Sequence, residues 1–197
     1  MTTTPPPIAH SERLIAVVGP SGAGKDSVLE AWRTLIARER SQAMPHYAKR
    51  VITRAADAGG EAHEAVDPAT FHRLREVGSF AIHWQAHGLH YGVRSESIAA
   101  LQEGRWVVVN TSRAHLPVLR EAAPGVRVVE ITAPCEVLAR RLAERAREDV
   151  VAMQQRLQRA GIGVQADLVV HNVGDVGDAA RQLHEWWLTL PPQGGGR

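Results

Sequence analysis

The sequence predicts an α/β protein in which a five-stranded parallel sheet carries helices on both faces. Short apolar runs alternate with segments of helical periodicity along the chain, which is the pattern of parallel strands joined by crossover helices. The run at residues 106–109 is continuously apolar, as expected of a strand that is covered on both faces. We expect one domain over residues 13–190, between a disordered leader at 1–12 and a flexible tail at 191–197.

The first apolar run, residues 14–18, leads directly into the segment GPSGAGK, which fits the pattern G-x-x-x-x-G-K. Residues 26–38 follow with helical spacing, and strand, glycine loop and helix in this order are the context of a phosphate-binding loop. Glycines let successive N–H groups point at one anion, and the helix N-terminus adds partial positive charge. Lys25 is one of only two lysines in a chain that otherwise uses arginine, so a structural turn is the weaker interpretation. We therefore predict a P-loop kinase fold whose ATP-binding residues are Gly19, Pro20, Ser21, Gly22, Ala23, Gly24, Lys25, Asp26 and Ser27.

Composition excludes several other classes of protein. No apolar run approaches the ~20 residues that a membrane span needs, and the N-terminus lacks the pattern of a secretory signal. The single cysteine, Cys135, excludes an internal disulfide and fits a reducing cytoplasm. A formal charge of +2 gives no argument for binding nucleic acid. We expect a cytoplasmic enzyme whose partners are small molecules.

The first half of the chain is predicted to contain an insert that binds the acceptor, at about residues 53–95. A strand is expected at 46–53, a polar functional loop at 54–64, and a helix that starts with Asp67 as N-cap and ends at Gly78. Two short apolar runs flanking a His-Gly turn then indicate a hairpin, and a short helix should follow it. The hairpin strands are expected at 80–85 and 89–92, and the short helix at 95–102.

The second half continues the alternation, with strands expected at 106–109, 126–131 and 168–170 and helices at 114–122, 134–145, 150–160 and 176–190. Ligands in parallel sheets bind outside the carboxyl ends of the strands. The phosphate loop, residues 110–113 and the loop beginning at Arg54 all follow such ends. We expect these three segments to converge on one cleft.

An arginine-rich stretch at about residues 140–160 is predicted to form a lid. Phosphoryl transfer needs positioning and cancellation of charge, and arginines that close over the phosphates would supply both and exclude water. Arg145 and Arg147 are the preferred candidates over Arg140 and Arg141, because they lie at a polar break between two helices. Arg156, on the following helix, is a further candidate. The alternative is a solvated helix face balanced by Glu136, Glu144 and Glu148.

The segment GPSGAGK resembles the phosphate loop of guanylate kinases, and the resemblance extends over about residues 13–187. It includes Thr53-Arg54 followed by Gly60-Glu61, the Tyr91-Gly92 pair and the lid-like stretch. Several segments more specifically resemble the ribose 1,5-bisphosphate phosphokinase family, and these are Gly24–Ser27, Ile52–Arg54, His87–Val93 and Val108–Pro117. The resemblance implies phosphorylation of ribose 1,5-bisphosphate by ATP to 5-phosphoribosyl 1-diphosphate and ADP, in phosphonate breakdown.

Departures from guanylate kinases agree with the more specific resemblance. Guanylate kinases carry a second arginine shortly after the one matched by Arg54, whereas Asp57 stands near that place here. They also carry an acidic residue for guanine recognition where this chain has Asn110. Without that carboxylate the guanine N–H groups lose an acceptor, which favours a sugar phosphate without a base. Asp26, where Ser or Thr is usual, matches the more specific family.

The candidate roles follow from this interpretation. Lys25, Arg145 and Arg147 are the catalytic candidates, with Lys25 following charge toward the transferred phosphoryl group. Mg²⁺ is the expected metal, and Asp26 would bind it directly, bind it through water, or only cap the helix, in which case Ser27 supplies the hydroxyl. Arg54 is the first choice for gripping an acceptor phosphate, the alternative being a surface arginine. The other acceptor candidates are Tyr91 and Arg113 for phosphate and Asn110 and Glu61 for ribose hydroxyls.

Other functions remain open on the sequence alone. The nearest alternative is a nucleoside monophosphate kinase for GMP, and a more distant one is a guanylate kinase-like interaction module without catalysis. Such modules typically lose the phosphate loop, whereas Gly19, Gly24 and Lys25 are present here. His83, His87 and His90 are close enough in sequence to raise the question of zinc, but no cysteine or carboxylate completes a set.

Overall fold

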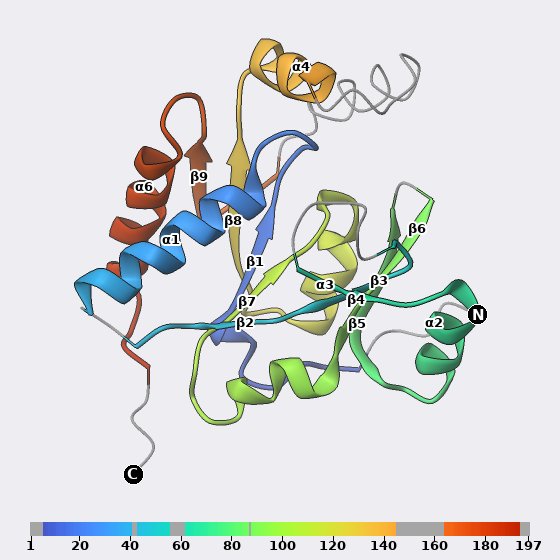
Figure 1. Cartoon of the computed structure of the whole chain (residues 1–197). Coiled ribbons are helices and arrows are strands. Elements are labelled where there is room, and N and C mark those ends of the chain that lie inside the picture. The colour runs from blue at the N-terminus through green and yellow to red at the C-terminus, as the bar shows by residue number, and fades with distance from the viewer. Residues whose placement is uncertain (1–5, 41–42, 56–61, 87, 145–163, 194–197) are drawn as a thin grey trace. The chain divides into compact units, whose positions relative to one another are not determined.

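The computed structural model describes residues 6–40, 43–55, 62–86, 88–144 and 164–193 (Figure 1). It contains the predicted five-stranded parallel sheet, with strand order β2-β7-β1-β8-β9, and a second sheet of four strands with order β4-β3-β6-β5. The chain divides into two compact units. We call Met1–Ala16, Pro45–Arg127 and Gln193–Arg197 the hairpin unit, and Val17–Met44 and Val128–Pro192 the P-loop unit.

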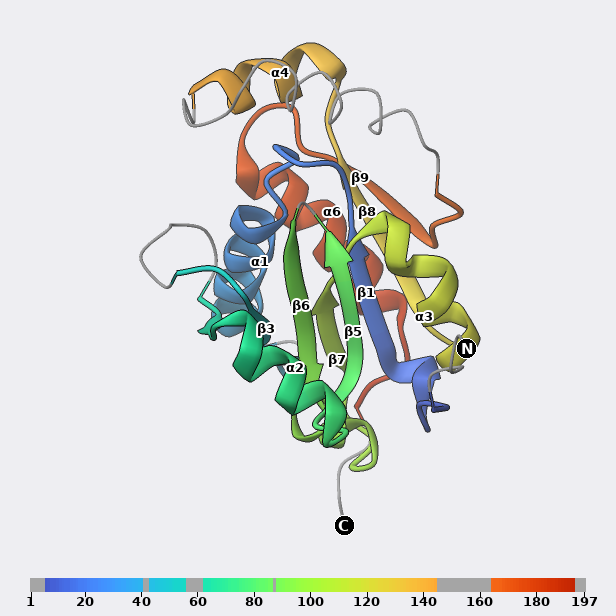
Figure 2. The same ribbon diagram turned by 90° about the vertical axis from the view of Figure 1, so that its right-hand side faces the viewer.

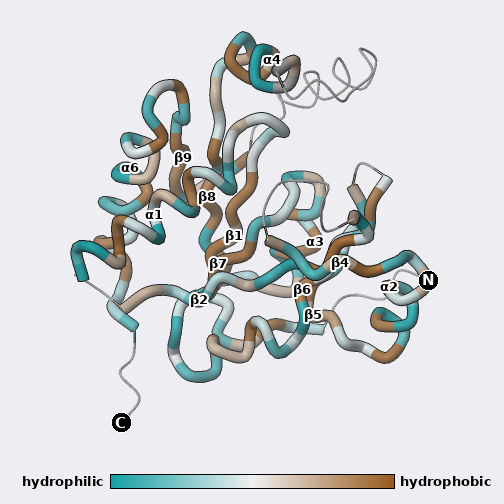
Figure 3. Tube along the Cα trace, viewed as in Figure 1, coloured by the Kyte–Doolittle hydropathy of each residue, from teal (hydrophilic) through white to brown (hydrophobic). Residues whose placement is uncertain are grey.

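The P-loop unit is built on strands that match the predicted ones closely. It holds the end of β1 (Leu14–Val18), most of β8 (Arg127–Thr132) and β9 (Leu168–His171), and its helices are α1 (Lys25–Glu39), α4 (Cys135–Glu144) and α6 (Val176–Thr189). Every residue of β1 is buried, as the apolar run predicts. Figure 3 shows β1 and β8 as mostly hydrophobic segments, which agrees with strands that lie inside the protein.

Helices α1 and α6 lie side by side in this unit (Figure 1). Trp32 of α1 meets Trp187 of α6 edge-to-face, with ring centroids 5.7 Å apart, and both rings are buried. The imidazole Nε2 of His184 lies 2.8 Å from Glu39 Oε2 and adds a polar tie between the same helices. Trp187 is therefore part of the core, whereas Trp186 is only partly buried.

The hairpin unit carries most of the predicted acceptor insert. Its elements are η1 (Ser11–Arg13), β2 (His46–Tyr47), β3 (Arg50–Ile52), β4 (Glu64–Ala65), α2 (Pro68–Glu76), β5 (Phe80–Ala86), β6 (Leu89–Arg94), η2 (Ser95–Leu101), β7 (Val107–Asn110), η3 (Arg113–His115) and α3 (Leu116–Ala122). The predicted hairpin is confirmed, because β5 and β6 pair antiparallel (Figure 2). The predicted start of α2 is also confirmed: the Asp67 carboxylate accepts a hydrogen bond from the Thr70 N–H at 2.8 Å.

The four-stranded sheet has two different faces. On one face, α2 buries Phe71 against Val51 and Phe80, and the Phe71 and Phe80 rings stack with centroids 4.8 Å apart. A Cβ on Gly92 would lie 2.6 Å from a Phe80 ring carbon, so glycine is what lets this ring lie flat on the sheet. Cross-strand pairing places Ile52 opposite Tyr91 and Tyr91 opposite Trp84. Since directly paired residues share a face, these rings belong to the face that α2 does not cover.

The local structure departs from prediction at three places. The expected single strand at 46–53 is two strands, because β2 pairs with β7 in the large sheet and β3 pairs with β6 in the small one. The expected leader at 1–12 is not disordered throughout: the Ile8 side chain is buried, its N–H bonds to the Ala122 carbonyl at 2.7 Å, and Ser11 Oγ accepts from the Gly125 N–H. In addition, the polar loop expected to extend to residue 64 ends earlier, since Glu64 starts β4.

The remaining strands and helices agree with prediction to within a few residues, and η2 is a 3-10 helix. The expected polar break at 145–149 and the helix at 150–160 lie outside the described residues. None of the helices in the described part of the chain has the length and apolar character required to cross a membrane.

Candidate active site

The phosphate loop has a backbone that only glycine adopts easily. Gly22 and Gly24 have φ angles of 85° and 78°, in the left-handed region. Gly19 is limited by space as well, because a Cβ there would lie 2.0 Å from the Ile131 carbonyl oxygen of β8. The glycines that define the sequence pattern therefore have a steric cause, and the loop is held closely against the neighbouring strand.

The loop ends at the N-terminus of α1. Gly24 occupies the N-cap position of this helix and has no side chain with which to cap it. The first N–H groups of a helix have no partner within it and carry partial positive charge, which makes this end suited to an anion. Lys25 folds back over the loop, where its Nζ donates to the carbonyls of Gly19 at 3.1 Å and Pro20 at 3.3 Å. The ammonium thus already lies over the predicted phosphate position.

Asn172 supports the loop from β9 and was missed by the sequence analysis. Its backbone N–H bonds to the Thr132 carbonyl at 2.8 Å, and its side-chain Nδ2 donates to the Ala23 carbonyl at 2.8 Å. A Cβ on Gly24 would lie 2.5 Å from this Nδ2, so the amide packs directly on the loop. The only sequence signal was a polar residue just after the last predicted strand, which is too common a pattern to single it out.

Arg141 also reaches the phosphate loop. Its Nη1 lies 3.9 Å from the position that a Cβ on Gly24 would take, and this nitrogen is buried without a hydrogen-bond partner among the described residues. A buried guanidinium N–H without an acceptor is costly, and a phosphate oxygen would satisfy it. Arg140, next to it, is exposed. Arg141 thus presents a buried N–H beside the phosphate loop.

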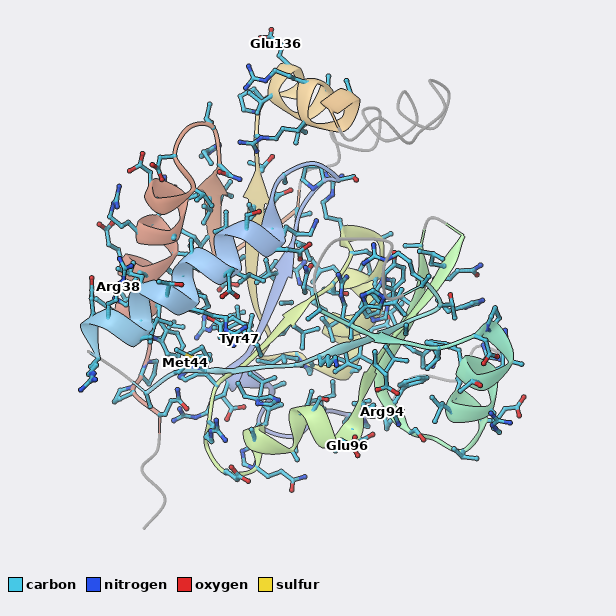
Figure 4. The ribbon with its side chains drawn as sticks, viewed as in Figure 1. Arg38, Met44, Tyr47, Arg94, Glu96 and Glu136 are labelled. Carbon is cyan, nitrogen blue, oxygen red and sulfur yellow. The ribbon has the colours of Figure 1, made fainter. Side chains whose placement is uncertain are left out.

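This placement changes the order of the lid candidates. The sequence favoured Arg145 and Arg147 over Arg141, but those two residues and Arg156 lie outside the described part of the chain. The lid and the alternative of a solvated helix face both stay predictions. Within α4, Glu136 is exposed and projects outward from the helix (Figure 4), whereas Leu138 and the Arg141 Nη1 are buried. The helix therefore has an inner side that carries a cation.

Asp26 and Ser27 lie in the first turn of α1, directly after the loop, and both are exposed. A carboxylate and a hydroxyl at this place are hard oxygen donors. Magnesium typically takes one or two protein oxygens and completes its octahedron with phosphate oxygens and water. The donor set therefore fits Mg²⁺ bound together with a nucleotide.

In the hairpin unit, Arg54 follows the end of β3. Its Nε is buried and has no hydrogen-bond partner among the described residues, while its backbone carbonyl lies 3.2 Å from His63 Nε2. The Thr53 hydroxyl accepts from the His90 N–H at 2.9 Å and fixes the chain immediately before it. Arg54 therefore resembles Arg141 in presenting a buried N–H that an anion would satisfy, and its role at an acceptor phosphate stays a prediction.

A column of stacked rings stands on the uncovered face of the small sheet. Tyr91 stacks on Trp84 with centroids 5.2 Å apart and planes at 7°, and His115 stacks on Trp84 at 5.3 Å. The guanidinium of Arg50 lies over the Tyr91 ring at 5.4 Å from its centroid. We expected residues 110–113 and the loop beginning at Arg54 to lie close together. The column connects their neighbours, because His115 follows the first segment and Tyr91 pairs with β3, which leads to Arg54.

The end of β7 supplies buried polar groups to the same unit. Asn110 and Thr111 are almost completely buried, and Thr111 Oγ1 has no hydrogen-bond partner among the described residues. Ser112 caps η3 by accepting from the His115 N–H, and Arg113 begins that turn, partly buried. Glu61, predicted as a ligand of ribose hydroxyls, lies outside the described residues.

Arg94 has a structural role. It makes a two-pronged ion pair with Glu64, with Nε–Oε2 and Nη2–Oε1 distances of 2.9 and 2.6 Å. The hydrogen bond from Arg94 lowers the pKa of Glu64 below its usual value. The pairing of β3 with β4 places Glu64 beside Val51, on the face that α2 covers. Arg94 lies at the end of β6 (Figure 4). This arginine is therefore already neutralised on the opposite face from the ring column.

Three histidines of the hairpin unit have lowered pKa values. Burial, helped by the charge of Arg75, lowers the pKa of His83, and burial followed by the charges of His72 and Arg75 does the same for His90. Burial and then the charge of His83 lower the pKa of His115 to about 4. No group of three potential metal-ligating side chains occurs within the described residues.

Comparisons with known proteins agree with this geometry. The sequence pattern of the guanylate kinase family matches residues 11–187. Among solved structures, guanylate kinase from Anaplasma phagocytophilum superposes with a TM-score of 0.60 at 19% identity, covering 89% of this chain and 84% of that one. An unliganded sugar kinase from Janibacter sp. HTCC2649 gives a TM-score of 0.51 at 18% identity, with coverages of 91% and 96%. These two likenesses show the fold, and the chain is a member of the guanylate kinase family.

Curated relatives define a narrower group. A protein of Agrobacterium fabrum named ribose 1,5-bisphosphate phosphokinase PhnN is 41% identical, over 86% of this chain and 93% of its own length. Proteins of the same name from Rhizobium etli and Ruegeria sp. are 42% and 46% identical, and cover 93% and 87% of this chain and 94% and 88% of their own lengths. The chain belongs to the ribose 1,5-bisphosphate phosphokinase family, as the sequence motifs predicted.

The neutral state of His115 leads to a testable pH dependence of stability. A histidine with a pKa of about 4 in the folded protein and about 6.5 when unfolded takes up protons preferentially in the unfolded state between those pH values. Stability from this group is therefore complete above pH 6.5 and is lost as the pH falls toward 4. When the pH is lowered from 7 to 5, we expect the unfolding free energy of the wild type to fall by roughly 2 kcal/mol more than that of His115→Gln.

Urea unfolding of both proteins at the two pH values measures this difference. The same measurements on His10→Gln, which removes an exposed imidazole, serve as the control. An identical pH dependence in wild type and His115→Gln would contradict the buried, neutral state of this ring.

Proposed function

We propose that this protein transfers the γ-phosphoryl group of ATP to the 1-phosphate of ribose 1,5-bisphosphate. An oxygen of the 1-phosphate attacks the γ-phosphorus, the bond from that phosphorus to the β–γ bridging oxygen breaks, and ADP leaves. The product is 5-phosphoribosyl 1-diphosphate. The observation that carries the proposal is the 41–46% identity, over most of both chains, to relatives bearing the name of this activity.

The P-loop unit supplies the groups that would hold ATP. Backbone N–H groups of the loop and of the first turn of α1 bind phosphate oxygens. Lys25 exchanges its loop carbonyls at 3.1 and 3.3 Å for the β- and γ-phosphates, and Arg141 adds a guanidinium from α4. Both cations neutralise charge that shifts toward the leaving ADP, and neither forms a covalent bond.

The hairpin unit supplies the groups that would hold the acceptor. Arg54 offers a buried N–H to a phosphate, and its planar fork suits two phosphate oxygens. Tyr91 and Arg113 are further phosphate donors, and Asn110 is a donor and acceptor for ribose hydroxyls. The acceptor atom belongs to a phosphate that is already ionised near neutral pH, so the reaction needs no residue to remove a proton.

We propose Mg²⁺ as the metal, held by Asp26 or Ser27 together with nucleotide phosphate oxygens. The ion neutralises charge on the β- and γ-phosphates when bound. The carboxylate and hydroxyl are adjacent at the start of α1, so the ion is tied to the same turn that receives the phosphates.

The identity of the acceptor is tested by an ADP-release assay with ribose 1,5-bisphosphate and GMP in parallel. We expect turnover with ribose 1,5-bisphosphate and at least ~100-fold lower kcat/KM with GMP, because Asn110 stands where a guanine-binding carboxylate would be needed. Formation of 5-phosphoribosyl 1-diphosphate should be verified directly by mass spectrometry. Turnover of GMP alone would reverse the proposal in favour of a guanylate kinase.

Arg141 is tested by replacement with Gln, which keeps its length but removes its charge. Because a hydrogen bond to a charged group is worth about 1.5–3 kcal/mol, we expect kcat/KM for ATP to fall roughly 10- to 100-fold. Arg140→Gln is the matched control, one position away but exposed, and should change kcat/KM by less than about threefold. Equal effects of the two substitutions would rule out a specific phosphate contact by Arg141.

The metal role of Asp26 is tested by Asp26→Asn, which keeps the shape of the side chain. If the carboxylate helps to hold Mg²⁺, the Mg²⁺ concentration for half-maximal rate should rise about 10-fold or more, with Ser27→Ala measured alongside. A carboxylate that only caps α1 would leave both the metal requirement and the rate unchanged.

A further inference from the structure

Asn172 lies where a side chain can determine the shape of the phosphate loop. We propose that Asn172 is a positioning residue for phosphoryl transfer, and that its side-chain amide holds the peptide between Ala23 and Gly24 in the orientation that binds a nucleotide phosphate. In this role the residue acts through the loop and not by contact with a substrate. The proposal rests on the proposed function, because that function assigns the loop to ATP.

The orientation of the Asn172 amide follows from its partner. Its Nδ2 lies 2.8 Å from the Ala23 carbonyl oxygen, and a carbonyl oxygen only accepts hydrogen bonds, so the NH2 group faces the loop. The residue is 4% exposed, and its Oδ1 is buried without a hydrogen-bond partner among the described residues. A buried acceptor without a partner costs free energy. The bond to Ala23 is therefore the interaction that favours an amide at this place over an apolar side chain.

The large sheet fixes the backbone of Asn172. Its N–H bonds to the Thr132 carbonyl at 2.8 Å, one residue beyond the pairing of Thr132 with His171 in the parallel strands β8 and β9. Its short side chain has two torsions, and a Cβ on Gly24 would lie only 2.5 Å from Nδ2. The amide is thus held between a paired strand and the loop, and it has little room for another position.

The tie to the Ala23 carbonyl also sets the direction of the next N–H. In a trans peptide the C=O and the N–H point to opposite sides, so the Gly24 N–H is turned away from Asn172. The peptide before Ala23 is held as well, because the Ala23 N–H donates to the Pro20 carbonyl at 3.2 Å. The Gly24 N–H lies at the junction of the loop and α1, where loops of this kind bind phosphate oxygens.

The glycines of the loop allow this conformation but do not enforce it. Gly22 and Gly24 have φ angles of 85° and 78°, and glycine adopts negative φ angles about as readily. The peptides around Ala23, between these two glycines, could therefore rotate at small cost if no side chain held them. Asn172 supplies the restraint that glycine lacks. Its removal should leave a protein that folds but binds phosphate less tightly.

Asn172→Leu tests the proposal in the full-length chain, because leucine has a similar size and cannot donate a hydrogen bond. We expect the Kd for ATP to rise about 10- to 100-fold, as for the loss of a hydrogen bond to a charged group. KM for ribose 1,5-bisphosphate should change by less than about threefold, since the acceptor groups belong to the hairpin unit. Inorganic tripolyphosphate is the discriminating probe, because it carries phosphates without a base or a ribose. Its Kd should rise by a factor similar to that for ATP.

Two further variants separate the lost hydrogen bond from the fit of the new side chain. Asn172→Ala removes the same donor without adding bulk and should weaken the binding of both ligands in the same way. Gln182→Ala makes the matched exchange at an exposed position of α6 and should leave both Kd values unchanged. An unchanged Kd for tripolyphosphate in folded Asn172→Leu or Asn172→Ala would overturn the proposal. A loss of affinity confined to ATP would also overturn it, because the effect would then lie at the base or the ribose.

Hydrogen exchange in the wild type tests the tie without any substitution. The chain contains only two asparagines, Asn110 and Asn172, so labelling with ¹⁵N-asparagine gives two side-chain NH2 groups. Labelling with ¹³C-histidine assigns Asn172, because His171 precedes it whereas Val109 precedes Asn110. Without nucleotide, one proton of the Asn172 NH2 group should exchange at least ~10-fold more slowly than in the urea-unfolded chain. Exchange as fast as in the unfolded chain would contradict a tie that forms before ATP binds.

The proposed function can fail separately. If the wild type does not turn over ribose 1,5-bisphosphate, that function is wrong, and calorimetric titration with ATP and tripolyphosphate still tests Asn172. Binding of both ligands by the wild type that is no tighter than by Asn172→Leu would then reject this role for the asparagine.

Discussion

The close fit of the phosphate loop against its neighbours is the constraint on which the P-loop unit depends. Gly19 lies against the Ile131 carbonyl of β8, and Gly24 lies against the Asn172 amide that follows β9. Each contact excludes a Cβ, and each comes from a different strand of the sheet. The loop conformation is therefore set by strands that are more than a hundred residues away in sequence, and the N–H groups are preorganised before any nucleotide binds.

In the hairpin unit, the two faces of the four-stranded sheet differ in what they carry. One face is closed by α2 through Phe71 and Phe80, and it also carries the Glu64–Arg94 ion pair. The other face carries the Tyr91, Trp84 and His115 rings and Arg50. Rings that stack on one another are stiff, and the Arg50 guanidinium lies against the Tyr91 end of this column. Packing and binding are in this way separated onto opposite sides of the same strands.

The sequence predicted the fold and the phosphate loop because both depend on local patterns. Continuous apolar runs marked β1, β7 and β8, and the glycine pattern followed by a lysine marked the loop. The division of residues 46–53 between two sheets was not predictable in this way, because both halves have strand composition and only tertiary pairing distinguishes them. Ile8 was placed in a leader for a similar reason: one apolar side chain among prolines gives no periodic signal, although it packs in a core.

The candidate site residues also divide into those marked by a local sequence pattern and those marked only by tertiary contacts. Lys25 and Arg54 stand in recognisable motifs, whereas Asn172 and Arg141 gain meaning only from what folding places beside them. Arg141 shows most clearly what the sequence alone cannot predict. Arg140 and Arg141 are adjacent, and the sequence gives no reason to prefer Arg141, whose Nη1 is buried, over the exposed Arg140.

The chemistry of a phosphate acceptor explains why arginines recur at these places. Joining two phosphates requires that two polyanions approach each other, and their mutual repulsion must be offset by fixed positive charge that does not have to reorganise during the reaction. Arginine remains protonated at every physiological pH and binds two oxygens through a rigid fork, so it serves better than a histidine that burial has already made neutral. In the P-loop unit the buried Nη1 of Arg141, and in the hairpin unit the buried Nε of Arg54, belong to cations whose charge does not change with pH, whereas the low pKa of His115 leaves that ring neutral near pH 7.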